Sequence, residues 1–174
     1  MNVIIILMGY MGSGKSSIGK AFSLKTKKHF IDLDKFIEST YNSNISSIFK
    51  QKGEIFFRKI ERQCLEQLLN SNKYSIISIG GGTPCYFDTI HFLNKLGHIT
   101  IFFKASINTL TNRLFNEIDN RPLISHLGSR EKLSDFIAKH LFERNKYYNK
   151  AQFLIEVDGK DIATIINELE NKLT

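Results

Sequence analysis

The chain has 174 residues, a length that predicts a single domain able to bury roughly 70% of its unfolded surface. Its two cysteines, Cys64 and Cys85, are too few for a disulfide framework and favour a reducing cytosol. The formal net charge of +7 comes from lysines spread along the chain rather than from a basic stripe, so we expect no nucleic-acid partner.

The first predicted element is an apolar, β-branched run at residues 3–7, which we expect to form a strand. Because this run is far too short to span a membrane, no membrane segment is expected and the protein is predicted to be cytoplasmic. The loop GYMGSGKSS follows at residues 9–17, and residues 18–26 are expected to form a helix. The pattern G-x-x-x-x-G-K-[ST] between a strand and a helix is typical of a phosphate-binding loop.

The residue types in this loop suit a polyphosphate. Gly9, Gly12 and Gly14 let the backbone curl with its N–H groups pointing inward, where side chains would block the phosphates. The helix N-terminus that follows favours anions. Lys15 can reach the β- and γ-phosphates, and Ser16 offers a hydroxyl where a phosphate-bound Mg²⁺ would lie. The alternative is a glycine-rich turn that only starts a helix.

A second strand is expected at residues 29–32, with a helix starting at Asp34. Asp32 and Asp34 are two residues apart, so in extended backbone their side chains share a face at the exit of the strand. One carboxylate near Ser16 can hold Mg²⁺ through water, and the other can bind an acceptor hydroxyl or act as a general base. Alternatively, Asp34 only caps the helix after it.

A turn at residues 41–44, a short helical segment and Gly53 precede a predicted helix over residues 54–70. Arg58 and Glu61 lie three residues apart on this helix. On the surface, such a pair would contribute only about 0.3 kcal/mol to stability. In a cleft, Glu61 could instead hold Arg58 so that its guanidinium binds a substrate carboxylate through two parallel hydrogen bonds.

The third strand, expected at residues 74–79, leads directly into Gly80, Gly81 and Gly82. Each glycine costs backbone entropy, and a plain tight turn needs one or two of them. Three in a row at the end of a strand indicate a close approach of backbone N–H groups to a ligand.

The fourth strand is expected at residues 99–103, and Ser106 can cap the helix after it. Arg113 on that helix could stack on a base or have no role. A polar segment at residues 119–130 then interrupts the alternation of strands and helices. Its Arg121 could close over the γ-phosphate while the segment excludes water, or it could be an exposed loop arginine.

A long helix is expected over residues 131–148, then a fifth strand at residues 153–157 and a last helix with an apolar stripe. Arg144 lies on the long helix, where its spacing alone is more typical of a solvated face than of a site. Apolar strands that alternate with helices predict an α/β fold with a parallel sheet covered on both sides. Ligands in such sheets bind at the carboxyl ends of the strands, where the motifs above fall.

Taken together, these motifs resemble those of shikimate kinases over almost the whole chain. The stretches that carry the resemblance are GYMGSGKSSIGK, DLDKFIE, NISSIF, GEIFFRKIE, GGG, RPL and ERNKYY, in this order. A phosphate loop alone names a superfamily, whereas D-x-D, F-R-x-x-E, G-G-G and R-P-L in this order name a family.

The resemblance implies a P-loop kinase fold of the nucleoside-monophosphate-kinase type, with a five-stranded parallel sheet flanked by helices. It implies one kinase domain over residues 1–174, with a substrate-binding segment at 33–62 and a lid at 119–130. The implied reaction is transfer of the γ-phosphate of ATP to the 3-hydroxyl of shikimate, on the pathway to chorismate and the aromatic amino acids. We expect a monomer.

The resemblance also implies a role for each matching residue. ATP would bind to Gly12, Ser13, Gly14, Lys15, Ser16, Ser17 and the lid residue Arg121, and Mg²⁺ to Ser16 and, through a water, Asp32. Shikimate would bind to Asp34, Arg58, Gly80, Gly81, Gly82 and Arg144, with the two arginines on its carboxylate. The catalytic groups would be Lys15, Asp34 and Arg121. Asn44 stands where the family usually has glycine; asparagine tolerates the left-handed region, so the turn is expected to persist.

Two other functions remain open at this point. A kinase for another small carboxylate, such as gluconate, would also need arginines, but the F-R-x-x-E and G-G-G motifs favour shikimate. A nucleotide-binding module without catalysis could bind RNA through a basic surface. The presence of Lys15, Ser16, both aspartates and Arg121 argues against such a module.

Overall fold

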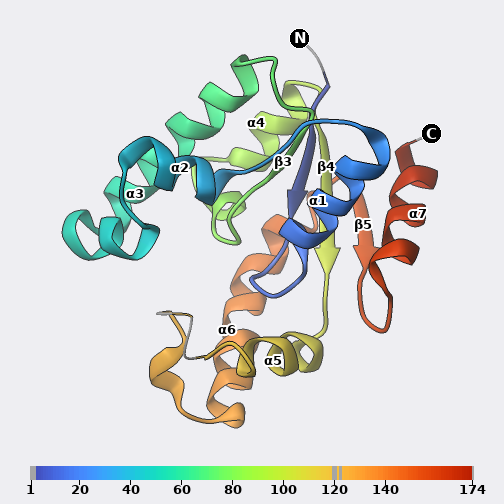
Figure 1. The fold of residues 1–174 in the computed structure, drawn as a ribbon. Coiled ribbons are helices and arrows are strands. Elements are labelled where there is room, and N and C mark those ends of the chain that lie inside the picture. The colour runs from blue at the N-terminus through green and yellow to red at the C-terminus, as the bar shows by residue number, and fades with distance from the viewer. Residues whose placement is uncertain (1–2, 119–120, 122, 174) are drawn as a thin grey trace.

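A five-stranded parallel sheet lies at the centre of the structure, a computed structural model that describes residues 3–118, 121 and 123–173 (Figure 1). The strands are β1 Ile5–Met8, β2 Phe30–Asp32, β3 Ile76–Ser78, β4 Ile99–Lys104 and β5 Phe153–Glu156. Their order in the sheet is β2-β3-β1-β4-β5. The α/β fold with a five-stranded parallel sheet, predicted from the sequence, is confirmed.

The central strand β1 is apolar because it is covered on both faces. All four of its residues are buried. Ile6 of β1 pairs with Ile77 of β3 on one side and with Thr100 of β4 on the other. Along the edge strand β2, burial is only partial. The continuous apolar runs in the sequence therefore mark the interior of a parallel sheet.

Helices cover both faces of this sheet. They are α1 Lys15–Thr26, α2 Leu33–Tyr41, α3 Ile45–Asn70, α4 Thr89–Lys95, α5 Ile107–Phe115, α6 Arg130–Tyr148 and α7 Ile162–Leu173. In Figure 1, α1 lies in front of the sheet, α6 lies behind it, and α2 with α3 extends away to one side. There are also two short 3₁₀ turns. One, η1 Thr83–Cys85, follows the triple glycine, and the other, η3 Ser125–Leu127, precedes α6. No helix in these described ranges combines the length and apolar character that crossing a membrane requires.

Several helix boundaries differ from the prediction. The helix expected to start at Asp34 begins at Leu33, because the Asp32 carboxylate caps it by accepting from the backbone N–H of Asp34. The two helical segments predicted around Gly53 form one element, α3, with a kink at this glycine (φ +78°, ψ 172°). Since the prediction placed a break here, the local backbone is as expected and only the continuity differs.

The turn before α3 is built differently from the prediction for Asn44. Asn44 is extended (φ −72°) and caps α3, its Oδ1 accepting from the backbone N–H of Ser47 at 2.7 Å. The left-handed residue is Asn42, at the C-terminus of α2 (φ +46°). The turn is thus kept, but Asn44 contributes a cap rather than left-handed backbone.

The carboxyl ends of the inner strands bring distant parts of the chain together. Asp32 at the end of β2 is in register with Ser78 of β3, and Ser78 is in register with Leu7 of β1. The loops that follow these three strands therefore begin side by side. Of the predicted lid segment at 119–130, residues 119, 120 and 122 lie outside the described residues.

Candidate active site

Three glycines set the shape of the loop between β1 and α1. The φ angles are +151° at Gly9, +79° at Gly12 and +94° at Gly14, a region that side chains disfavour. Space is limiting as well. A Cβ at Gly9 would lie 2.7 Å from the carbonyl oxygen of Phe103, and one at Gly12 would lie 3.0 Å from Cγ of Leu114. Both conformation and packing therefore require these glycines.

The loop ends at a helix N-terminus with free donors. Gly14 is the N-cap of α1 and makes no side-chain capping bond, and the first turn has no acidic residue. Ser13 is buried, and its Oγ has no hydrogen-bond partner among the described residues. Backbone donors, the helix dipole and a buried hydroxyl together fit an anion, and they fit the phosphates expected from the sequence.

Lys15 lies against the same loop. Its Nζ donates to the carbonyl oxygen of Gly9 at 2.9 Å and to that of Tyr10 at 3.0 Å. Burial lowers the pKa of Lys15 to about 8, although the nearby carboxylates of Asp34 and Asp32 favour its charged form. A poorly solvated ammonium held by two neutral carbonyls can exchange them for phosphate oxygens.

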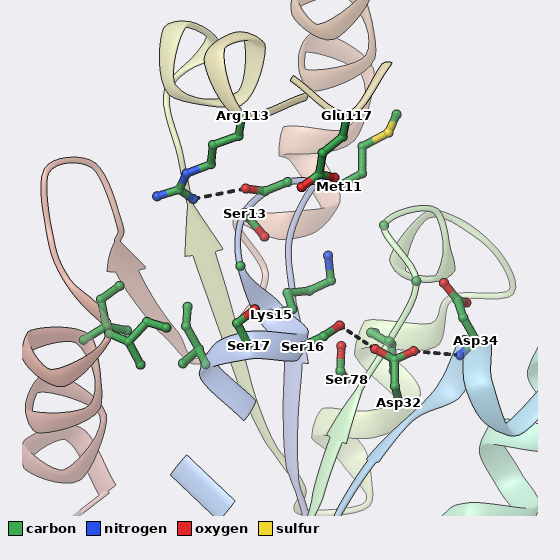
Figure 2. Close-up of a pocket in the computed structure, with 18 of the residues that line it drawn as sticks. Met11, Ser13, Lys15, Ser16, Ser17, Asp32, Asp34, Ser78, Arg113 and Glu117 are labelled. Atoms are coloured by element: carbon green, nitrogen blue, oxygen red, sulfur yellow. Dashed lines mark hydrogen bonds between the residues drawn. The ribbon is translucent and has the colours of Figure 1, made fainter. Parts of the chain in front are cut away.

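Ser16, Asp32 and Asp34 are linked by hydrogen bonds below Lys15 (Figure 2). Ser16 Oγ donates to Asp32 Oδ2 at 2.6 Å, and Asp32 Oδ1 accepts from the backbone N–H of Asp34 at 3.1 Å. The backbone from Asp32 to Asp34 is not extended throughout, as the shared-face argument assumed, because Asp34 lies in the first turn of α2. Nevertheless, both side chains line the same cavity.

This oxygen pair suits a hard cation. Mg²⁺ prefers oxygen ligands and usually keeps water and substrate phosphates in its shell. Among the described residues, no group of three or more His, Cys, Asp and Glu side chains is arranged to hold a metal ion. Ser16 and Asp32 therefore fit Mg²⁺ that arrives with phosphate, rather than a metal site made by the protein alone.

Asp34 has a perturbed acidity. Burial raises the pKa of its carboxyl to about 6, the negative charges of Asp32 and Glu61 raise it as well, and Lys15 opposes the rise. A carboxyl group with a pKa just below neutrality can accept a proton from a bound hydroxyl. The reading of Asp34 as a simple helix cap is wrong, since Asp32 is the cap.

The loop, Lys15 and the aspartates line a cavity of about 460 Å³. In Figure 2, Arg113 and Glu117 lie on one side of it, Ser16, Asp32 and Ser78 on the other, and Lys15 projects between them. Arg113, whose role was left open, lines the cavity, and its Nη1 donates to the carbonyl oxygen of Gly12 at 3.0 Å.

Sequence reasoning missed one wall of this cavity. Lys160, Ile162 and Ile165 line it from the loop after β5 and from α7. The carboxylate of Asp158 holds this loop in place by accepting from the backbone N–H of Ser106 at 3.0 and 3.1 Å. The rule that ligands bind beyond the carboxyl ends of parallel strands pointed to this loop, but the apolar spacing of α7 predicted only a core stripe.

Arg121 also lines the cavity. Its Nε donates to Glu117 Oε2 at 2.8 Å, and about a third of its side chain is exposed (37%). Its positive charge is close enough to help lower the pKa of Lys15. Arg121 is therefore a cation at the cavity edge, held by the carboxylate of Glu117, four residues earlier in the chain.

Arg58 and Glu61 form a buried pair rather than a surface pair. Arg58 is 9% exposed and Glu61 is 2% exposed. Arg58 Nη1 donates to Glu61 Oε2 at 2.9 Å, and Glu61 Oε1 accepts from Thr83 Oγ1 at 2.7 Å. The guanidinium carbon lies 4.4 Å from the ring centre of Tyr86. Glu61 and the ring of Tyr86 therefore fix the orientation of the buried Arg58 guanidinium.

Each glycine of the triple-glycine loop leaves room for a functional neighbour. A Cβ at Gly80 would lie 3.1 Å from both Asp34 Oδ1 and Glu61 Oε1, and one at Gly82 would lie 2.5 Å from Arg58 Nη2. A Cβ at Gly81 would lie 3.3 Å from the carbonyl oxygen of Gly9. The loop is therefore the contact point between the phosphate loop, Asp34 and Arg58.

Arg144 reaches this region from α6. Its guanidinium carbon lies 5.5 Å from the ring centre of Tyr10, and its charge acts on the pKa of Lys15 and Cys85. One turn later, Tyr148 Oη donates to the carbonyl oxygen of Gly81 at 2.5 Å. The solvated helix face that spacing alone indicated for Arg144 is not what the structure shows.

The structure thus brings together most, but not all, of the predicted residues around one space. The cavity is lined by Gly12, Ser13, Gly14, Lys15, Ser16, Ser17, Asp32, Asp34, Gly80, Gly81 and Arg121. Arg58, Gly82 and Arg144 do not line it. Arg58 lies against Gly82, and Arg144 lies over the ring of Tyr10, one turn of α6 before Tyr148, which donates to Gly81.

Comparison with known proteins agrees with this geometry. Residues 11–174 match the family model described as shikimate kinase. The chain is 43% identical over 169 residues to a shikimate kinase from Flavobacterium psychrophilum, covering 97% of this chain and 98% of that protein. A shikimate kinase from Flavobacterium johnsoniae is 44% identical over 165 residues, covering 95% of each chain.

Solved structures give the same result. A shikimate kinase from Bacteroides thetaiotaomicron superposes with a TM-score of 0.91 at 34% identity, covering 98% of each chain. The shikimate kinase from Acinetobacter baumannii, in complex with shikimate, has a TM-score of 0.83 at 25% identity, covering 99% of this chain and 96% of that one. The family match, the full-length relatives and the shared fold agree, and the chain belongs to the shikimate kinase family.

Proposed function

We propose that this protein transfers the γ-phosphoryl group of ATP to the 3-hydroxyl of shikimate, giving shikimate 3-phosphate and ADP on the pathway to chorismate and the aromatic amino acids. One observation carries the proposal. An anion-binding loop and a buried, glutamate-bound arginine lie on two sides of one glycine loop, and Asp34 contacts that loop between them. A phosphate donor and a carboxylate-bearing acceptor would therefore meet at a carboxyl group.

The nucleotide half of the site consists of the phosphate loop and the lid arginine. Gly12, Ser13, Gly14, Lys15, Ser16 and Ser17 would bind the phosphates of ATP through backbone N–H groups, hydroxyls and the ammonium. Arg121 would approach the γ-phosphate from the segment at 119–130, which we propose as the lid. Ser16 and, through a water, Asp32 would hold Mg²⁺, which supplies neutralisation of phosphate charge when bound.

The acceptor half consists of the segment at 33–62, the triple-glycine loop and α6. Arg58 and Arg144 would bind the carboxylate of shikimate, because guanidinium groups match that ion with paired donors. Gly80, Gly81 and Gly82 would let the ring approach the backbone. Asp34 would bind the 3-hydroxyl.

The chain's own groups account for the chemistry of transfer. The 3-hydroxyl oxygen forms a bond to the γ-phosphorus, the bond between that phosphorus and the β–γ bridging oxygen breaks, and the hydroxyl proton passes to Asp34. Lys15 and Arg121 stabilise the charge on the transferring group. Since phosphoryl transfer needs little covalent assistance, we expect positioning to supply most of the rate enhancement.

The cellular setting is part of the proposal. Both cysteines are free, with Cys64 buried and Cys85 partly buried, which suits a reducing cytoplasm. Both the donor half and the acceptor half of the proposed site are formed by this chain, so catalysis needs no residue from a second copy, and we expect a monomer formed by one kinase domain.

Acceptor-dependent ADP release by the purified protein with ATP and Mg²⁺ tests the function. Shikimate, gluconate, a nucleoside monophosphate and no acceptor are compared, and we expect stimulation by shikimate alone. Stimulation by gluconate alone would replace the substrate and keep the reaction class. If ATP binds but no acceptor stimulates release, the protein is a nucleotide-binding module and the proposal is wrong.

A further inference from the structure

One face of α6 carries a row of four large aromatic or basic side chains. Phe136, His140, Arg144 and Tyr148 are spaced four residues apart, so they follow one another along the helix. Tyr148 and Phe136 pack inward, and Arg144 lies between His140 and Tyr148. The proposed function uses Arg144 and leaves His140 without a role.

His140 is joined to the phosphate loop. Its Nδ1 lies 3.0 Å from the hydroxyl oxygen of Tyr10, and the two rings meet edge to face with centres 6.1 Å apart. The ring of Phe136 covers His140 with centres 4.1 Å apart. A side chain of α6 is therefore hydrogen-bonded to the loop that precedes Lys15.

Tyr10 is a fixed point for this contact. Its side chain is 1% exposed. Its carbonyl oxygen accepts from the backbone N–H of Ser13 at 3.2 Å and from Lys15 Nζ at 3.0 Å. Both the ring and the backbone of Tyr10 are thus held by the fold.

A second contact holds α6 on the other side of Arg144. Tyr148 Oη donates to the carbonyl oxygen of Gly81 at 2.5 Å, so the helix is bonded to the triple-glycine loop one turn after Arg144. The contact between His140 and Tyr10 lies one turn before it. Arg144 therefore lies midway along two turns of α6 that are hydrogen-bonded to the phosphate loop at one end and to the triple-glycine loop at the other.

The surroundings of both partners of the contact between Tyr10 and His140 favour their neutral forms near pH 7. Burial raises the pKa of Tyr10, so its hydroxyl keeps its proton. Burial lowers the pKa of His140, the positive charges of Arg144 and Lys139 lower it further, and Glu143 opposes them. The bond therefore joins a hydroxyl to a ring whose neutral form is favoured, so neither partner of this bond supplies a counter-charge to Arg144.

We propose that the hydrogen bond between Tyr10 and His140 is a positioning device that sets Arg144 for the carboxylate of the acceptor. This inference rests on the proposed function, in which Arg144 binds shikimate. Because Tyr10 belongs to the phosphate loop, the arginine that grips the acceptor is aligned directly on the loop that holds the donor. Tyr10 and His140 act through Arg144 and touch neither substrate.

Steady-state kinetics of three variants test the proposal. In Tyr10→Phe and His140→Leu, the KM for shikimate is expected to rise about threefold to tenfold, the range of one net hydrogen bond, while the KM for ATP changes by less than about twofold. In His140→Asn, the side-chain amide can accept or donate near the place of Nδ1, so the KM for shikimate is expected to stay within about twofold of wild type.

Tyr147→Phe is the matched control, because it removes a hydroxyl from the neighbouring position of the same helix, where the ring lies beside Lys146 and Lys150. Its kinetics are expected to match wild type. Thermal unfolding of every variant identifies any that fails to fold, and Tyr10→Phe, the smallest change, then decides.

An unchanged shikimate KM in both Tyr10→Phe and His140→Leu would overturn the inference while wild-type activity kept the proposed function intact. Equal rises in the two KM values, or no rescue by His140→Asn, would show a purely structural bond and would also overturn it. Wild-type protein that does not phosphorylate shikimate would overturn the function and the inference together.

Discussion

At the scale of single residues, burial decides what a charged pair means. Arg58 and Glu61 have the spacing of a common surface pair, yet Arg58 is only 9% exposed and Glu61 only 2%. Glu61 accepts from Arg58 through one oxygen and from Thr83 through the other, so both carboxylate oxygens have a partner within the protein. On the side away from Glu61, Arg58 Nε and Nη2 donate to the exposed Glu54 Oε1 at 3.4 and 3.3 Å, and a substrate carboxylate can replace these long bonds.

Arg58→Ala is expected to raise the KM for shikimate at least about 100-fold, because a charge-assisted, paired hydrogen bond to the carboxylate is lost. The KM for ATP is expected to change far less. Arg62→Ala is the control on the same helix: Arg62 pairs with Glu66 and lies over Phe92, away from the glycine loop. Equal losses for both substrates would exclude a carboxylate-binding role.

The removal of Arg58 also leaves Glu61 buried without its cation. Breaking such a pair costs about 3 kcal/mol of stability. Arg58→Lys keeps the charge but not the planar fork, so it is expected to recover most of the thermal stability and little of the shikimate affinity. Thermal melts of the two variants separate the effect on binding from the effect on folding.

Arg121 belongs to the same scale but to another step. Arg121→Ala is expected to lower kcat about 100-fold with little change in shikimate affinity, because its charge is needed when the γ-phosphoryl group moves. Arg130→Ala is the matched control, since Arg130 lies nearby, bonds to Asn112 and packs over Phe115. A turnover number that stays at the wild-type value would remove Arg121 from the mechanism.

At the scale of elements, α3 shows how one residue sets the direction of a helix axis. Its kink is at Gly53, where φ is +78°. Glu54 follows at once, and its Oε1 accepts from Arg58 Nη2 at 3.3 Å and from Tyr86 Oη at 2.7 Å. The kink therefore sets the direction of the helical turn that carries the predicted acceptor-binding arginine.

Gly53→Ala tests this role of the kink. No atom lies within 4 Å of a Cβ at Gly53, so the strain comes only from the backbone, whose φ of +78° and ψ of 172° lie in a region essentially restricted to glycine and cost about 1–3 kcal/mol. Gly97→Ala is matched to it, with φ +77° and equally open space at the end of α4. Both variants are expected to lose stability, but only Gly53→Ala is expected to raise the KM for shikimate.

Equal KM values in the two variants would mean that α3 keeps its direction without the glycine. A loss of ATP affinity in Gly53→Ala would also contradict the prediction, because Gly53 lies in the acceptor half of the site.

At the scale of the whole molecule, periodicity and motif order were enough to predict the sheet and most of the cavity. The phosphate loop, both aspartates and the triple glycine could be placed because parallel strands end at one edge. Asp32 as the cap of α2 was not predicted, since Asp32 and Asp34 are only two residues apart and aspartate is favoured both at the cap and in the first turn. Lys160, Ile162 and the partnership of Tyr10 with His140 join segments far apart in the chain, which local spacing does not reveal.

The charges at the centre of the site weaken the fold that holds them. Burial raises the pKa of Asp34 to about 6 and lowers that of Lys15 to about 8. The charged form of each side chain is therefore less stable in the folded protein than it is in water. Their mutual attraction offsets part of this cost. A site preorganised for proton and phosphoryl transfer is therefore expected to be a net destabilising feature near neutral pH.

Asp34→Asn tests this trade-off. The folded pKa of about 6 lies above the ordinary value of 3.8, so the carboxylate costs no stability well below pH 3.8, and the cost grows as the pH rises from there through 6. The variant is expected to melt several degrees above wild type at pH 7.5, to come close to it at pH 4, and to lose most of its turnover. Asp135→Asn, at an exposed position on α6, is the control and is expected to leave both melting temperatures unchanged. A lower melting temperature for Asp34→Asn at pH 7.5 would show that attraction to Lys15 outweighs the cost of burial, and Asp34 would then stabilise the fold it serves.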